Sequence, residues 1–166
     1  EYFERHAKWL KEGVFQNTRL IQTFSDVEAI RSSGEFGILM YVQKPFPLGG
    51  GISRIQEFYD KGLRVFQLAY GLQHHEQEPE DVLGYGCYET GGVTPLGKRV
   101  IAELNRLGML VDVSHCNEET PLDACRLSTM PVVCTHAGAR AVTEARLNRN
   151  KSDVALKAIA ATGGVV

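Results

Sequence analysis

Apolar runs of strand length alternate with segments of helical periodicity from about residue 25 to the end of this 166-residue chain. The runs lack the in–out alternation of half-exposed strands, which indicates a parallel sheet covered on both faces. The expected strands are residues 37–43, 63–70, 109–115 and 131–136, with another strand starting at 164. The expected helices are residues 25–34, 52–62, 94–108, 118–128 and 151–163. This order is typical of successive βα units.

The helix at 94–108 has the clearest boundaries. Thr94 is a typical N-cap, Pro95 suits the first turn and Gly108 suits the end of a helix. Ser25 is the expected N-cap of the first helix.

Polar residues recur at the carboxyl ends of the expected strands, namely Gln43, Tyr70, His115 and His136. A doubly wound sheet and a (β/α)₈ barrel both fit the element order, but barrel strands converge on one mouth, where active sites lie. No GxGxxG turn supports the doubly wound alternative. We therefore predict an α/β fold of the TIM-barrel type, as a single domain over residues 1–166. With four to five βα units, the chain is expected to be an incomplete barrel and part of a larger protein.

Composition and charge argue against several classes of function. The net charge of -2 gives no reason to expect nucleic-acid binding, and no run approaches the roughly 18 apolar residues of a membrane span. The four cysteines show no CxxC spacing, so we expect reduced thiols and a cytoplasmic location. Export or lipid anchoring through segments outside these residues stays open, as does a homo-oligomer.

The two strand-terminal histidines are candidate metal ligands. Neutral imidazole commonly binds zinc, and ligands must converge from separate elements. A single histidine here would be explained better as a strand cap that bonds a neighbouring carbonyl. Because His115 and His136 end successive strands, we favour ligands, while position alone leaves the structural alternative open.

The sequence TPLGKRVIAELNRLGMLVDVSH, followed by PVVCTHAGARAV and RNKSD, closely resembles the membrane (renal) dipeptidase family of the amidohydrolase superfamily. The resemblance is strong from about residue 35 to the end and weak before it. It implies a (β/α)₈ barrel with a two-zinc site that hydrolyses dipeptides by a metal-activated water. A dipeptide substrate and zinc, as one or two divalent ions, are the expected partners.

The resemblance also implies roles for individual residues. His115 and His136 match the two histidines that ligate the second metal. Arg149, in the pattern Arg-Asn-x-x-Asp, matches the arginine that holds the substrate carboxylate. Gln43 occupies the position of the bridging glutamate, and Tyr70 that of a substrate-contacting histidine.

The chain also departs from the family pattern. The His-x-Asp pair of the family's first strand has no counterpart, since no HxD occurs here. The neutral amide of Gln43 can ligate one ion but bridges two cations less well than a carboxylate. We therefore expect that the whole protein is a zinc-dependent dipeptidase and that this 166-residue chain is inactive on its own. Another amide or lactam hydrolase of the superfamily, or a catalytically silent barrel piece with an interaction role, stays open.

Three further residues need a separate interpretation. His74 and His75 lie in the long loop at 71–93 and are either an extra ligand or exposed loop residues. Asp112, three residues before His115, is expected to be a buried structural carboxylate paired with a neighbour.

Overall fold

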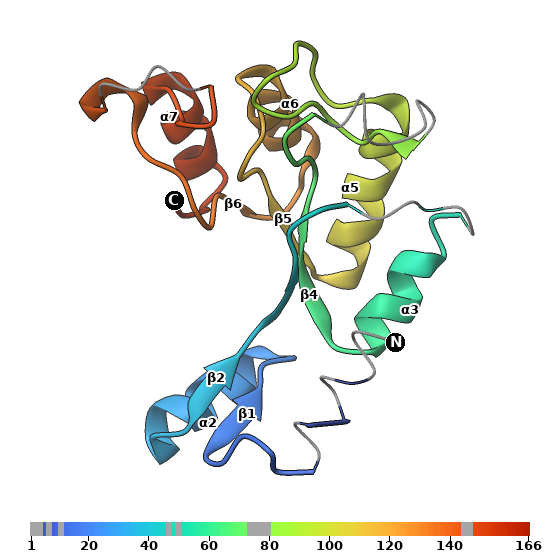
Figure 1. Cartoon of the computed structure of the whole chain (residues 1–166), viewed down its shortest axis with the longest axis vertical. Coiled ribbons are helices and arrows are strands. Elements are labelled where there is room, and N and C mark those ends of the chain that lie inside the picture. Colours follow the sequence, from blue (N-terminus) through green and yellow to red (C-terminus); the bar gives the residue numbers. More distant parts are fainter. Residues whose placement is uncertain are drawn as a thin grey trace.

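The computed structural model describes residues 5, 8–9, 12–45, 48, 51–72, 81–143 and 148–166. Its main sheet has four parallel strands in the order β3-β4-β5-β6 (Figure 1). These strands are Met40–Val42, Leu63–Gln67, Leu110–Asp112 and Val132–Val133. Spatial order follows chain order, so each strand lies beside the one that precedes it, as the sequence predicts.

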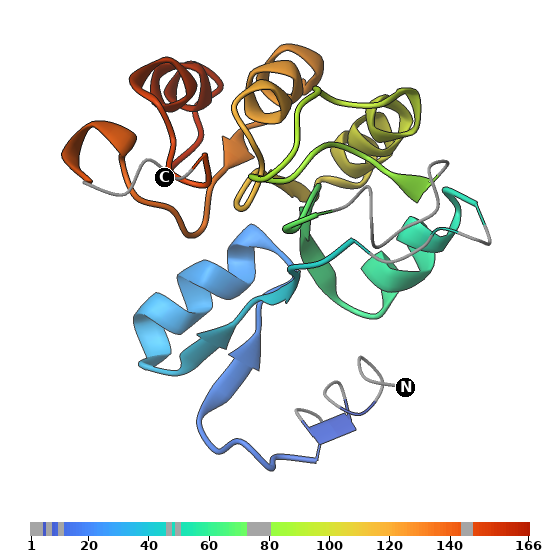
Figure 2. The ribbon, with the colours of Figure 1, turned by 45° about the horizontal axis from the view of Figure 1, so that its top comes forward.

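Helices connect the strands and cover the sheet. The helices that follow β3, β4, β5 and β6 are α3 (Arg54–Asp60), α5 (Pro95–Leu107), α6 (Glu119–Leu127) and α7 (Asp153–Ala161). Neighbouring helices pack in pairs, α3 on α5, α5 on α6 and α6 on α7, and Figure 2 shows α5, α6 and α7 in succession around the strands. After α7, the amide of Cys134 donates to Val165 O at 2.9 Å. The chain therefore returns beside β6, where the sequence predicts that another strand starts.

The sequence signals of α5 act as expected. Thr94 Oγ1 accepts a hydrogen bond from Gly97 N at 3.0 Å, and Pro95 occupies the first turn. Gly108 ends the helix with φ of 70°, a left-handed conformation that glycine adopts without steric cost. The apolar face of the helix buries Val100, Ile101 and Leu104 against the strands.

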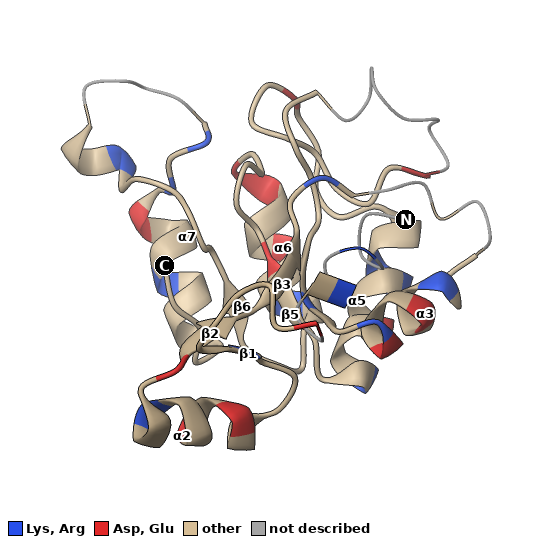
Figure 3. Cartoon of the chain, turned by 60° about the horizontal axis from the view of Figure 1, so that its bottom comes forward, with Lys and Arg blue, Asp and Glu red and all other residues tan. Residues whose placement is uncertain are grey.

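The core fills the space between the sheet and these helices. Its fully buried members include Phe66 of β4, Leu104 of α5 and Val111 of β5. Lys, Arg, Asp and Glu lie mainly on the helices and loops around the sheet (Figure 3). No helix within the described ranges is long and apolar enough to cross a membrane.

The N-terminal part differs from the sequence prediction. The predicted strand at 37–43 is divided into β2 (Phe36–Ile38) and β3. β2 pairs in parallel with β1 (Thr18–Leu20), a strand that the sequence analysis does not predict. The two sheets are separate because β1 pairs only with β2, whereas β3 joins β4.

Helix α2 (Phe24–Ser33) connects β1 to β2, and its N-cap is Thr23, so the expectation of Ser25 is wrong. Thr23 Oγ1 accepts from Asp26 N, while Asp26 Oδ2 accepts from Thr23 N at 2.7 Å. This reciprocal capping box satisfies two backbone donors at once, which a cap at Ser25 would leave free.

Candidate metal centre

Four predicted residues meet at the carboxyl end of the main sheet. Gln43 follows β3, Tyr70 follows β4, His115 follows β5 and His136 follows β6. The amide nitrogen of Gln43 lies 3.3 Å from Nε2 of His115 and 3.2 Å from Nε2 of His136. The two imidazole centroids are 4.9 Å apart, and the Tyr70 ring lies 4.3 Å from that of His115. Parallel strands thus bring residues far apart in sequence to one edge.

His115 sits in a strained turn after β5. Its φ is 62°, in the left-handed region, which costs an L-residue other than glycine roughly 1–2 kcal/mol. The turn is closed by a hydrogen bond from Cys116 N to Val113 O at 3.3 Å. Strain of this kind persists only where surrounding contacts hold it, and it is frequent at functional sites.

The imidazole of His115 is neutral at physiological pH. Burial, followed by the positive charge of Arg149, lowers its pKa to about 4. The charges of His136 and Lys151 act in the same direction, while Asp112 opposes them. A neutral imidazole keeps a lone pair for a metal ion, so this environment suits a ligand.

His136 is oriented by its neighbour. Thr135 Oγ1 lies 2.9 Å from His136 Nδ1 and donates to Asp112 Oδ2 at 2.6 Å. Because the single hydroxyl proton goes to the carboxylate, the hydroxyl accepts from His136, whose Nδ1 therefore carries the hydrogen. The lone pair of His136 is then on Nε2, the atom that faces Gln43.

Asp112 accepts several hydrogen bonds beside the two histidines and has the structural role that the sequence predicts. It is fully buried and accepts from Ser114 N and Ser114 Oγ, both at 2.7 Å. Ser114 Oγ in turn accepts from His136 N at 3.1 Å. Sequence reasoning missed Thr135 and Ser114, whose only signal is that each directly precedes a candidate ligand.

A tyrosine and a glutamine extend this buried network. The Tyr41 hydroxyl donates to Oε1 of the fully buried Gln67, whose Nε2 donates to Ala69 O at 2.6 Å. Burial, with a contribution from Asp112, raises the pKa of Tyr41 far above its ordinary value. Tyr41 is therefore a hydrogen-bond donor under the site and is not ionised.

Arg149 lies in the segment that leads into α7, and its charge reaches His115. Its Nε is buried, and among the residues that the structure describes it has no hydrogen-bond partner. A buried guanidinium nitrogen without a partner is costly, so it suits an anionic ligand from outside. His74 and His75 fall outside the described residues.

The residues present fit one divalent ion. The Nε2 atoms of His115 and His136 converge on the amide of Gln43, and turning that amide by half a rotation would place its oxygen at the same point. No group of three or more His, Cys, Asp or Glu side chains in the described part of the chain could hold an ion. The donor set is therefore two imidazoles and a neutral amide, without a carboxylate.

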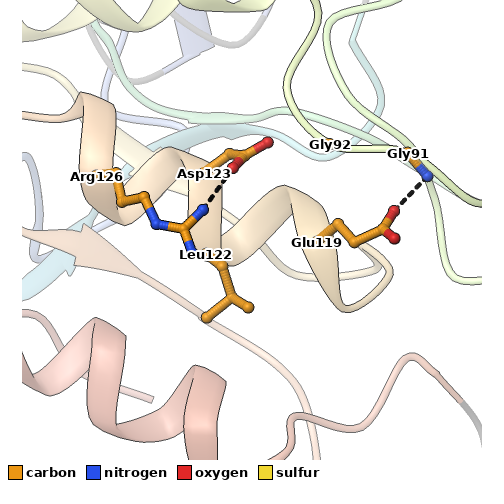
Figure 4. A pocket seen from close by; sticks show the side chains of 6 residues that line it. All are labelled: Gly91, Gly92, Glu119, Leu122, Asp123 and Arg126. Carbon is orange, nitrogen blue, oxygen red and sulfur yellow. Dashed lines mark hydrogen bonds and ion pairs between the residues drawn. The ribbon is translucent and has the colours of Figure 1, made fainter.

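A separate pocket of about 390 Å³ lies between the loop at 91–92 and α6 (Figure 4). Its charged groups are already used within the protein. Glu119 accepts from Gly91 N, and Arg126 Nη1 pairs with Asp123 Oδ1 at 2.9 Å. The first interaction fixes the loop on the helix and the second lies within the helix, which leaves the histidine cluster as the candidate site.

Comparison with known proteins gives a consistent result. The sequence model of the membrane dipeptidase family, peptidase family M19, matches residues 5–166. Dipeptidase 3 of Macaca fascicularis is 29% identical over 147 residues, which is 88% of this chain and 30% of that protein. The match to the family model includes residues 5–35, where the motifs alone showed little resemblance.

Two solved structures share the fold. An amidohydrolase from Pseudomonas aeruginosa is 28% identical with a TM-score of 0.84, over 98% of this chain and 48% of that one. A metallo peptidase from Rhodobacter sphaeroides, liganded with a phosphinate mimic of the dipeptide L-Ala-D-Ala, is 28% identical with a TM-score of 0.81. The alignment covers 98% of this chain and 46% of that peptidase.

The chain therefore spans about a third of the curated relative and about half of each structural neighbour. The likeness to these structures confirms the prediction of an α/β fold of the TIM-barrel type. The βα units of this chain form an incomplete (β/α)₈ barrel.

Proposed function

Because the chain belongs to the membrane dipeptidase family, peptidase family M19, we propose that the whole protein is a metal-dependent dipeptidase. The proposal is supported by the names of its relatives, which include dipeptidases and a metallo peptidase. The single observation that carries it is the convergence of His115 and His136 on Gln43, at 3.3 and 3.2 Å.

The proposed ligands from this chain are Nε2 of His115, Nε2 of His136 and the amide oxygen of Gln43. Zinc is the proposed ion, since imidazole nitrogen is among its preferred donors. When bound, such an ion polarises a carbonyl and lowers the pKa of a bound water toward ~7. Two imidazoles and an amide bring no negative charge, so these residues are expected to hold a single ion.

Arg149 is the proposed anchor for the substrate. Its guanidinium forms two parallel hydrogen bonds with a carboxylate, the group that every dipeptide carries at its C-terminus. The buried Nε without a partner among the described residues supports this role. The charge of Arg149 also lowers the pKa of His115, which supports a carboxylate site on the same side of the sheet as the proposed metal ligands.

We propose that the ring of Tyr70 lines one side of the substrate site. Its ring lies against that of His115 at a centroid distance of 4.3 Å and an interplanar angle of 30°. This contact restricts the imidazole to one orientation and shields one of its faces from water. We expect Tyr70 to contact the substrate, as the aligned histidine does in the family.

The experiment is a dipeptidase assay of the full-length protein with added zinc. We expect hydrolysis of simple dipeptides, loss of activity in His115→Ala and His136→Ala, and normal activity in the exposed-surface variant Arg126→Lys. The 166-residue chain alone should be inactive, because the four strands of the main sheet do not close a barrel of eight. If the full-length protein binds zinc through His115 and His136 but does not hydrolyse dipeptides, the result would favour another amide or lactam hydrolase. If it neither binds zinc nor hydrolyses dipeptides, the result would favour a catalytically silent barrel.

A further inference from the structure

Lys151 is a buried lysine beside the candidate metal centre. Its side chain is 1% exposed, whereas lysine is almost never fully buried unless its ammonium is paired. Nζ of Lys151 donates a hydrogen bond of 2.8 Å to the carbonyl of Cys116. A methionine would fill a similar volume without the cost of desolvating a charge. The hydrogen bond, and not packing, therefore explains a lysine at this position.

The Cys116 carbonyl belongs to the turn that carries His115. The positive φ of His115 is unfavourable, so the peptide that follows must be held by contacts with other segments. The amide of Asn117 donates to Tyr85 O at 3.1 Å and ties the turn to the loop before α5. The hydrogen bond from Lys151 Nζ to Cys116 O is a second connection, which joins the turn to the segment before α7.

The backbone of Lys151 is also fixed to the loop after β6. Its amide donates to Gly138 O at 3.0 Å, and its carbonyl accepts from Arg140 N at 2.9 Å. Gly138 is two residues after His136, and Arg149 is two residues before Lys151. One residue thus connects the three segments that carry His115, His136 and Arg149.

We propose that Lys151 is a positioning residue, which holds the turn of His115 at a fixed place relative to His136 and Arg149. The inference rests on the proposed function, because its consequence is the geometry of a metal and carboxylate site. Residues that orient metal ligands typically change metal affinity by about 10- to 100-fold when they are replaced.

The test is Lys151→Met in the full-length protein. Replacing a buried charge by an apolar side chain of similar size is often neutral or stabilising, so the thermal midpoint should be unchanged or higher. Zinc affinity, measured by competition with a chelator, should fall about tenfold or more, and the absorption spectrum of the cobalt-substituted protein should change. The KM for a dipeptide should rise. Lys157→Met, the same substitution at an exposed lysine of α7, should change none of these values.

A lower thermal midpoint with unchanged zinc affinity and an unchanged cobalt spectrum would make Lys151 merely structural and overturn the proposal. A crystal structure of Lys151→Met gives a readout that does not depend on the metal. A Cys116 carbonyl and a His115 turn that stay in place there would also overturn it, even if the dipeptidase function holds. If wild-type protein binds no zinc, the proposed function fails and the role of Lys151 fails with it.

If the methionine variant does not fold, Lys151→Arg provides the same measurements. Arginine keeps the charge but moves the donor, so we again expect weaker zinc binding and an altered cobalt spectrum. Wild-type values in that variant would contradict a positioning role.

Discussion

Thr135 Oγ1 and His136 Nδ1 lie 2.9 Å apart, so two adjacent residues of the chain are joined through their side chains. The same hydroxyl donates to the buried carboxylate of Asp112 at 2.6 Å. The result is a chain of two hydrogen bonds from Asp112 to the imidazole, which places the hydrogen on Nδ1 and the lone pair on Nε2. The orientation of a candidate ligand is therefore set by a residue of the preceding strand.

Thr135→Val should weaken zinc binding by the full-length protein about 10- to 100-fold, because valine has the same shape but cannot accept from Nδ1. Thr135→Ser keeps the hydroxyl and is the matched control, with zinc affinity close to that of wild type. Chelator competition measures both variants. Equal affinities for Val and Ser would show that Thr135 does not orient the imidazole.

Gln43→Glu should strengthen metal binding, because a carboxylate adds negative charge and can bridge two ions. We expect the metal content of the full-length protein to rise from about one ion per chain toward about two, the number in sites with a bridging ligand. Metal analysis after dialysis gives this ratio. Gln16→Glu, at an exposed amide in the turn before β1, is the control for added charge alone. A wild-type protein that already holds two ions would contradict our interpretation of the neutral amide.

Arg149→Lys should raise the KM for dipeptides while leaving zinc affinity close to wild type. A lysine keeps the charge but cannot form the paired hydrogen bonds of a guanidinium. One hydrogen bond to a charged group contributes about 1.5–3 kcal/mol, so KM should rise by about tenfold or more. Steady-state kinetics with Arg126→Lys as the matched control provides the measurement. A lower kcat with an unchanged KM would argue against carboxylate binding.

The four cysteines should be unreactive in the folded protein. Burial raises the pKa of the Cys116 thiol to about 12 and that of Cys125 to about 11, and it also raises the pKa values of Cys87 and Cys134. The reactive species is the thiolate, so labelling with iodoacetamide at pH 8 should be much slower than in denaturant. Rapid labelling of Cys125, which is only partly buried, would contradict this.

The same shifts predict that alkali destabilises the fold. Below the pKa of about 8.5 of an unfolded thiol, both states bind the proton and the thiols add no pH dependence to the free energy of unfolding. Above it, the unfolded state loses the proton first, so stability should fall between about pH 9 and the folded values near 11 and 12. Thermal midpoints measured from pH 8 to 11 test this, and Cys125→Ala should reduce the slope.

The sequence by itself determined the order of the βα units and the positions of the strand-terminal side chains. Periodicity, caps and glycine stops are local properties, as the confirmed boundaries of α5 at Thr94 and Gly108 show. Since parallel strands end at one edge, the sequence also placed Gln43, Tyr70, His115 and His136 in the same region. Their catalytic roles stay predictions.

Only the tertiary structure decided which strands pair and how the ligands are held. The division of residues 37–43 depends on pairing with β1, a contact between segments that share no local signal. The hydrogen bonds from Thr135 to Asp112 and from Lys151 to Cys116 likewise join segments that are distant along the chain. The positive φ of His115 is held by contacts of the same kind. Such contacts depend on where the backbone passes in three dimensions, because hydrogen bonds and burial act over a few ångströms in space, whatever the separation in sequence.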